Sequence, residues 1–311
     1  MSSRELSLLC MSVTPFHEDG TLDLEALRQH LGRLLARRIG VLLPGGGAGE
    51  AHSLSLRELR QVYEIGVEVG GGHVPVQAVL RESRTAAAMC EIAREAMRAG
   101  VDGMHIYQLD GGHMMVPNER EQDAYWSELL GVIDIPVVIS IGVHDRYPVS
   151  VEYVKRLCDR YPQIAGITVA AVSTSYFMKL RDRLPDRVKL RVGIASLLQY
   201  GALGADKCYG PEPNIVPNIC RSIVDSYRVG DRARMVDGVR TVQRLHNIVQ
   251  EWAPSTARWV KMAMKVLGLG NGVMRRPYLL PPEDDQRRMA KAFAALRLQE
   301  LEAQAGRDLD A

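Results

Sequence analysis

The sequence predicts an α/β fold, a closed (β/α)8 TIM barrel followed by a C-terminal helical extension. Two observations predict this class. Apolar runs of strand length alternate with amphipathic helical stretches as far as about residue 210, which is typical of parallel strands joined by crossover helices. The unbroken series holds eight such runs, and eight favour a closed barrel over an open, doubly wound sheet.

Each expected strand is a short apolar run, and a helix with one apolar face follows most of them. In chain order the strands are expected at residues 8–16, 40–46, 74–80, 103–108, 136–142, 164–170, 189–193 and 207–210. The helices between them are expected at residues 23–38, 56–69, 85–99, 118–132, 151–161 and 173–184.

After Pro217 the pattern becomes entirely helical, with segments at residues 218–229, 231–251, 255–267 and 282–303. This is more helix than one barrel needs for closure. We therefore expect a barrel over residues 1–216 and a helical extension over residues 217–311 that packs on it. The polar residues from 303 onward are expected to fray.

Composition narrows the function classes. A hydrophobic fraction of 46% and a charged fraction of 24% are those of a soluble globular protein. A net charge of +2 gives no reason to expect nucleic acid or an anionic membrane as partner. The five cysteines are scattered without Cys-x-x-Cys spacing, so neither a disulfide framework nor a zinc site is expected. With no signal-peptide pattern and no apolar run of about 20 residues, a cytoplasmic location is expected.

Several motifs follow one another in a characteristic order along the chain: Thr14-Pro15-Phe16, Gly46-Gly47-Ala48-Gly49-Glu50 with Leu54-Ser55, Ala99-Gly100-Val101-Asp102-Gly103, Asp134-Ile135-Pro136-Val137-Val138, Val260-Lys261 and Arg275-Arg276-Pro277. Together they resemble one known family, the dihydrodipicolinate synthase / N-acetylneuraminate lyase family. The resemblance covers about residues 8–300. It implies a TIM barrel, a small oxo-acid or carboxylate ligand, and a homo-oligomer, either a tetramer or a dimer.

The departures from this family cluster where its chemistry takes place. The family's lysine forms a Schiff base with pyruvate, but Gly166-Ile167 is followed here by Thr168, and a hydroxyl cannot form an iminium. The resemblance assigns the other catalytic positions as follows: the proton-shuttle tyrosine to Ser140, the carboxylate-binding threonine pair to Gly47-Ala48, and the substrate arginine to Asp145, or to Arg146 if the loop is one residue longer.

The active site of such a barrel lies at the carboxyl ends of the strands. The inward, upper positions, which we expect to bind or orient substrate, are Thr14, Gly46, Gly47, Ala48, Ser140, Thr168, Gly193 and Tyr209. The glycines around Gly46 can present N–H groups to a carboxylate. The alternative is a tight turn that needs no ligand.

Two groups of residues are candidates for proton transfer. His105 and Tyr107 share one side of the fourth strand, so both face the barrel interior or both face the helices; in the second case His105 packs between strand and helix. His144, with Asp145 and Arg146 in the fifth loop, could supply an acid/base and a carboxylate clamp, or be solvated. His113, with Asp110, could reach the same mouth or a neighbouring subunit.

A catalytic metal and a Schiff-base lysine at a new position are two alternatives to acid/base chemistry by the residues named above. Glu50, His105, His113 and His144 show no His-x-x-x-His spacing, so neither a metal nor another cofactor is expected. Lys207 shares a side with Tyr209 but begins its strand, far from the chemistry, and Lys179 lies on a helix.

The leading hypothesis is a lyase, dehydratase or isomerase on a small carbonyl or carboxylate metabolite. It would use non-covalent acid/base chemistry at His144, Tyr107, His105, Ser140 and Thr168. The alternative is a catalytically dead paralogue that binds ligands or regulates. A class I aldolase with a relocated lysine is a minor third.

Overall fold

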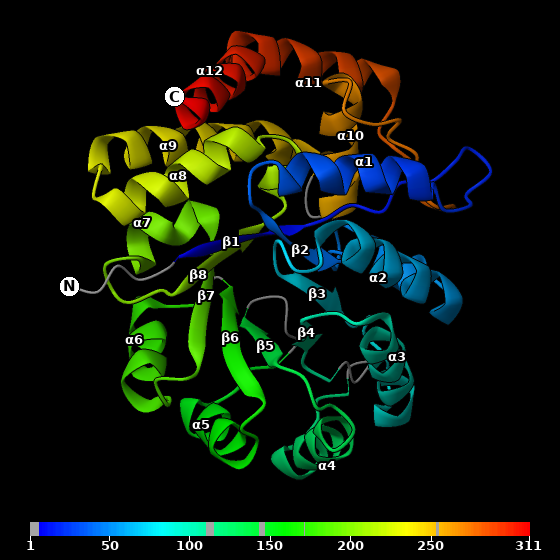
Figure 1. Ribbon diagram of the computed structural model, residues 1–311, viewed down its shortest axis with the longest axis vertical. Helices are drawn as coiled ribbons and strands as arrows, with labels where there is room; N and C mark the ends of the chain where they lie inside the picture. Colours follow the sequence, from blue (N-terminus) through cyan, green and yellow to red (C-terminus); the bar gives the residue numbers. More distant parts are fainter. Residues whose placement is uncertain (1–5, 110–114, 143–146, 171, 253–254) are drawn as a thin grey trace.

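Eight parallel strands close a barrel, as the sequence predicts. The computed structural model describes residues 6–109, 115–142, 147–170, 172–252 and 255–311. Each strand pairs with the next in chain order, and the last pairs with the first (Figure 1). The strands are β1 (Ser7–Met11), β2 (Gly40–Leu43), β3 (Val76–Val79), β4 (Gly103–Tyr107), β5 (Val137–Gly142), β6 (Ile164–Ala170), β7 (Lys189–Gly193) and β8 (Lys207–Gly210).

A helix follows each strand and covers the outside of the barrel (Figure 1). These helices are α1 (Leu24–Leu35), α2 (Leu56–Gly70), α3 (Ala86–Ala99), α4 (Glu119–Leu130), α5 (Val151–Arg160), α6 (Thr174–Arg183), the short α7 (Leu197–Tyr200) and α8 (Pro217–Val229). The last of them, α8, falls within the segment that was expected to form the C-terminal extension. Local sequence sets several of their starts. Ser55 and Glu58 form a capping box at α2, and Asn118 and Glu121 form another at α4, each satisfying N–H groups that a helix start leaves free.

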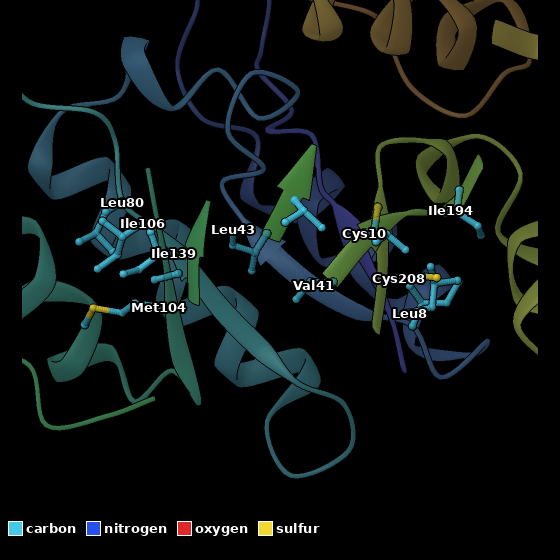
Figure 2. Close-up of a cluster of buried hydrophobic side chains, with 14 of the residues drawn as sticks. Leu8, Cys10, Val41, Leu43, Leu80, Met104, Ile106, Ile139, Ile194 and Cys208 are labelled. Carbon is cyan, nitrogen blue, oxygen red and sulfur yellow. The ribbon is translucent and has the colours of Figure 1, made fainter. Parts of the chain in front are cut away.

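The main hydrophobic core lies between the strands and the helices. Alternate strand residues such as Leu8, Cys10, Val41, Ile106 and Cys208 are buried in it, and Figure 2 shows these side chains gathered on the strands. Because successive side chains on a strand point to opposite faces, the residues between them face the barrel interior. A smaller cluster of Leu9, Leu42 and Val79 fills part of that interior.

The C-terminal extension is helical, but one expected helix is two. The helices are α9 (Arg232–Val249), α10 (Thr256–Val266), α11 (Glu283–Ala295) and α12 (Leu298–Asp310), gathered beside α1 and α8 in Figure 1. The predicted segment 282–303 breaks at Arg297, whose φ of 55° is left-handed. The expectation that residues from 303 onward fray is wrong, because Glu302 accepts the Asn218 and Ile219 N–H groups and Asp310 pairs with Arg37.

The first strand is shorter than predicted. It ends at Met11 rather than Phe16, because the following backbone turns to other partners. The Val13 N–H donates to Asn214 Oδ1 at 3.1 Å, and the Thr14 hydroxyl donates to the Gly49 carbonyl at 2.7 Å. The residues after β1 therefore form part of the rim above the strands. Among the described residues, no helix is both long and apolar enough to cross a membrane.

Candidate active site

Inward side chains of the barrel fall into layers drawn from alternate strands. The pairing register places Leu42, His105, Thr168 and Tyr209, all from even-numbered strands, in one layer. Leu9, Gln77, Val138 and Arg191, all from odd-numbered strands, form the layer beneath it. The upper layer therefore carries hydroxyl and imidazole groups, and the lower one carries a buried cation.

Thr168 lies within a row of polar residues. Tyr107 pairs in register with Ser140, and Ser140 pairs with Thr168. Thr168 is fully buried, and its Oγ1 has no hydrogen-bond partner among the described residues. A buried hydroxyl without a partner is costly. Such a group is expected where a ligand or water completes it.

His105 faces the barrel interior, not the helices. Its ring centroid lies 5.2 Å from that of Tyr107 and 6.5 Å from that of Tyr209, so three of the predicted site residues meet in one cluster. His105 is 2% exposed. Burial first, and then the charge of Arg191, lower the pKa of His105 to about 3. The alternative of a histidine packed between strand and helix is wrong.

Arg191 belongs to this cluster and was not among the predicted residues. Its Nη2 donates to Gln77 Oε1 at 3.0 Å, and its Nη1 lies 3.5 Å from His105 Nδ1. It is 2% exposed, and burial lowers its pKa to about 10. The signal was present in the sequence. Arg191 shares a side of its strand with Gly193, so the alternation that places Gly193 inward places Arg191 inward too.

The glycine loop after β2 reaches the same cluster. A Cβ on Gly46, whose φ is +55°, would lie 2.6 Å from the Tyr107 hydroxyl. The loop thus needs glycine both for its backbone angle and for its contact with Tyr107. Gly193 on β7 lies in register with Tyr209 on the adjacent strand β8. Gly46, Tyr107, His105 and Tyr209 are therefore brought together as a site requires.

Most N–H groups of this loop are already bonded. Gly45 N–H donates to Ser12, and Ala48 N–H and Ala51 N–H donate to carbonyls within the loop. Ala48 is fully buried, whereas Gly47 is exposed. Within the described residues, the Gly47 N–H donates to no backbone carbonyl. Of the backbone N–H groups expected to bind an anion, the Gly47 N–H is therefore the main one still available.

Two neighbours hold the loop in place. The Thr14 hydroxyl donates to the Gly49 carbonyl, so Thr14 positions the loop instead of lining an open pocket. A Cβ on Gly47 would lie 3.8 Å from Thr256, at the start of α10. The helical extension thus reaches the rim of the barrel, a contact that the sequence did not predict.

The ancestry of the chain is shown by its similarity to known proteins. The profile of the Dihydrodipicolinate synthetase family matches residues 5–296. This chain belongs to that family. It is similar to the 4-hydroxy-tetrahydrodipicolinate synthase of Bartonella bacilliformis, 26% identical with 90% of this chain and 94% of that one covered. It is 28% identical to that of Bradyrhizobium diazoefficiens, with 85% and 88% covered.

Solved structures of the same kind share the fold. The 4-hydroxy-tetrahydrodipicolinate synthase from Methylacidiphilum fumariolicum superimposes with a TM-score of 0.85 at 22% identity, covering 97% of this chain and 98% of that one. Dihydrodipicolinate synthase from Aquifex aeolicus gives 0.83 at 19% identity, covering 94% and 98%. The barrel of this Dihydrodipicolinate synthetase family member is thus the family's barrel.

Glu50, a candidate metal ligand in the sequence, is bound to other groups in this family member. It is fully buried and forms an ion pair with Lys261 of α10, while its Oε2 accepts the Arg275 N–H at 3.1 Å. Arg275 in turn holds Glu58 through two hydrogen bonds. This network ties the β2 loop to the extension. Across the described part of the chain, no three His, Cys, Asp or Glu residues are placed to hold a metal ion.

Some predicted residues lie outside the described part of the chain. They are Asp110, His113, His144, Asp145 and Arg146. The question of whether Asp145 or Arg146 takes the position of the family's substrate arginine falls on these residues. The roles of His144 and Arg146 stay predictions.

Proposed function

We propose that this family member is a lyase-type enzyme acting on a small carbonyl or carboxylate metabolite without a Schiff base. Thr168 takes the place of the Schiff-base lysine on β6, and Ser140 that of the proton-shuttle tyrosine. Substrate occupies the upper end of the barrel, where Tyr107, His105, Ser140 and Thr168 meet it. His144 and Arg146 act from the fifth loop, while Gly46, Gly47, Gly193 and Tyr209 complete the wall.

The distribution of lysines carries this proposal. All lysines lie within the described residues: Lys155, Lys179, Lys189, Lys207, Lys261, Lys265 and Lys291. Lys207 and Lys189 begin their strands, at the end of the barrel opposite the site. Lys261 is paired with Glu50, and the others are exposed on helices. The layer that contains Thr168 therefore has no amine to condense with a ketone.

The unpaired hydroxyl of Thr168 supports a ligand in the same layer. Tyr107, beside Gly46, is the group best placed to transfer a proton. Its ring is partly buried against the interior cluster, while its hydroxyl reaches the loop at the mouth. Tyrosine hydroxyls serve as general acids and bases when they lie within reach of substrate.

Borohydride trapping with pyruvate and related oxo-acids tests the covalent alternative. We expect no adduct by intact mass, with a 4-hydroxy-tetrahydrodipicolinate synthase trapped in parallel as positive control. Peptide mapping would locate any adduct that formed. A reduced adduct on Lys207 or any other lysine would reject the proposal and favour a relocated Schiff base.

Solvent deuterium exchange tests for turnover. We expect the protein to exchange protons next to the carbonyl of at least one small oxo-acid in D2O, measured by proton NMR. Tyr107→Phe should slow exchange by about 10²-fold or more. Leu198→Ala, at an exposed residue on α7, is the matched control and should exchange at the normal rate.

A second candidate is a binding protein without turnover. The internally bonded N–H groups of the glycine loop favour it, because they leave few donors for a developing negative charge. Saturable binding of an oxo-acid without any exchange would select this candidate. Family membership also supports a homo-oligomer, which light scattering of the purified protein would test.

A further inference from the structure

Arg191 is a buried cation that pairs with no Asp or Glu among the described residues, and the neighbouring Tyr209 offsets only part of the effect of burial on its pKa. Its guanidinium contacts two neutral side chains, Gln77 and His105, and its Nε has no partner. Burying a charge without an ionic partner costs free energy of folding, so such a group is usually retained for a function. Neither the motifs shared with the family nor the chemistry proposed for Tyr107 and Thr168 gives this arginine a role.

The contact with His105 restricts the histidine. A guanidinium has only donors and stays protonated in proteins. At the 3.5 Å contact between Nη1 and Nδ1, His105 Nδ1 must therefore accept. In a neutral imidazole the single proton then lies on Nε2.

Within the part of the chain that the structure describes, the titratable groups that contact His105 are consistent with a neutral ring. Arg191 comes from β7, Tyr107 from its own strand β4, and Tyr209 from β8. None of them is a carboxylate that would stabilise an imidazolium. Burial and the charge of Arg191 both lower the pKa of His105, to about 3. His105 is thus neutral throughout the physiological range.

We propose that Arg191 is a positioning residue that fixes His105 as the neutral Nε2–H tautomer, so that His105 donates a hydrogen bond to the substrate's carbonyl oxygen. The oxygen gains negative charge as a neighbouring proton is removed, and the fixed N–H stabilises it. The substrate class is accordingly a carbonyl compound that passes through an enolate or a similar oxyanion. Proton transfer is left to another group, such as Tyr107. That the acceptor of this hydrogen bond is a substrate carbonyl rests on the proposed function. The tautomer of His105 does not.

Nitrogen NMR of the histidine-labelled protein tests this directly. The chain has eight histidines, and His105→Gln identifies the signal of interest. We expect a protonated Nε2, an unprotonated Nδ1, and no titration between about pH 5 and 9. A protonated Nδ1, or a ring that charges near pH 6, would overturn the proposal whatever the enzyme does.

His30 provides a reference within the same spectrum. It is also buried, its Nε2 lies 2.9 Å from Asn214 Oδ1, and Arg33 Nη2 lies 3.3 Å from its Nδ1. Asn214 Oδ1 also accepts the Val13 N–H, so it is an acceptor, and His30 must carry its proton on Nε2. His30 and His105 should therefore show the same pattern.

Arg191→Met then separates positioning from packing. We expect His105 to populate both neutral tautomers and its pKa to rise. His30 should keep its single tautomer and its pKa. With a substrate found by deuterium exchange, kcat should fall by about 10²-fold with little change in KM, and an acidic limb should appear in the pH profile. An unchanged His105 signal in a folded Arg191→Met protein would refute the role of Arg191. A borohydride adduct would refute only the proposed function.

Discussion

Thr168 and Thr14 show how two buried threonines at one site can serve different purposes. Thr14 Oγ1 donates to the Gly49 carbonyl at 2.7 Å, whereas Thr168 Oγ1 has no partner among the described residues. A buried hydroxyl with a partner contributes to stability, and one without a partner costs free energy. The two residues therefore form a matched pair for separating stability from ligand binding.

Replacing each threonine with the isosteric valine should have opposite effects on stability. Thr14→Val leaves the Gly49 carbonyl without its donor, and we expect a loss of about 1–3 kcal/mol in the free energy of unfolding. Thr168→Val should leave stability unchanged or raise it by up to about 1 kcal/mol, while weakening exchange or ligand binding. Denaturant unfolding measures the first quantity and titration calorimetry the second. A large loss of stability in Thr168→Val would show that its hydroxyl is structural.

The limits of sequence-based prediction are clear at the level of single residues. Alternation along β4 correctly put His105 and Tyr107 on one side, but it left open which side. Arg191 decides the environment of His105, yet the two are 86 positions apart in sequence. Contacts across a barrel depend on register and strand tilt, and neither can be derived from local pattern.

Among the elements, the connection between the β2 loop and helix α10 rests on a buried ion pair. Glu50 has a left-handed φ of 52° and pairs with Lys261, whose ammonium also lies 4.3 Å from the Phe16 ring centroid and donates to the Val273 carbonyl. In the sequence, Glu50 and Lys261 belong to two separate motifs that resemble the family, 211 positions apart. Their separation along the chain hid the contact.

Breaking this pair should destabilise the protein strongly. Lys261→Met leaves the Glu50 carboxylate buried without its cation, and we expect a cost of about 3–5 kcal/mol in unfolding free energy. The double variant Lys261→Met with Glu50→Gln should recover part of this loss, because no charge is then left alone. Thermal and denaturant unfolding of the unmodified protein, the two single variants Lys261→Met and Glu50→Gln, and the double variant measure the coupling. Equal losses in the single and double variants would argue against an ion pair.

Local signals predicted most elements well, and they failed where tertiary contacts prevail. The helix starts at Ser55 and Asn118 follow from capping boxes that lie entirely within the sequence. The break at Arg297 has no glycine or proline to mark it. Helix α12, which follows the break, packs on α8, a tertiary contact that no local pattern predicts.

At the scale of the whole molecule, helix α12 of the extension packs against α8, the helix that follows the last barrel strand. Both carboxylate oxygens of Glu302 accept N–H groups at the start of α8, at 2.7 and 3.0 Å. Burial raises the pKa of Glu302 to about 7, against the lowering effect of these hydrogen bonds and of Arg33 and Arg37. The docking of α12 thus depends on a carboxyl group that titrates near neutral pH.

Stability should accordingly fall as pH rises through neutrality. The folded pKa of Glu302 lies above its usual value of 4.5, so the folded state holds a proton that the unfolded chain has released. This contribution is fully present below about pH 4.5 and is lost as pH rises through about 7. We expect Glu302→Gln to remove a pH-dependent term on the order of 2 kcal/mol. Thermal unfolding between pH 5 and 8 measures it, and parallel curves for both proteins would contradict the assignment.

The fold as a whole was the part most accessible from sequence, because eight alternating units leave few other topologies. The barrel interior was the least accessible. Its layers are assembled from alternate strands, and the unusual member, Arg191, lies within an otherwise ordinary strand, Lys189–Gly193.

The position of Arg191 also determines how the site responds to ionic strength. Salt screens charges that solvent reaches, over a distance of about 8 Å in physiological salt, but it acts far less on buried ones. Arg191 is 2% exposed, so mobile ions have little access to its field. The electrostatic environment of His105 should therefore persist in concentrated salt, where the many ion pairs on the outer helices weaken.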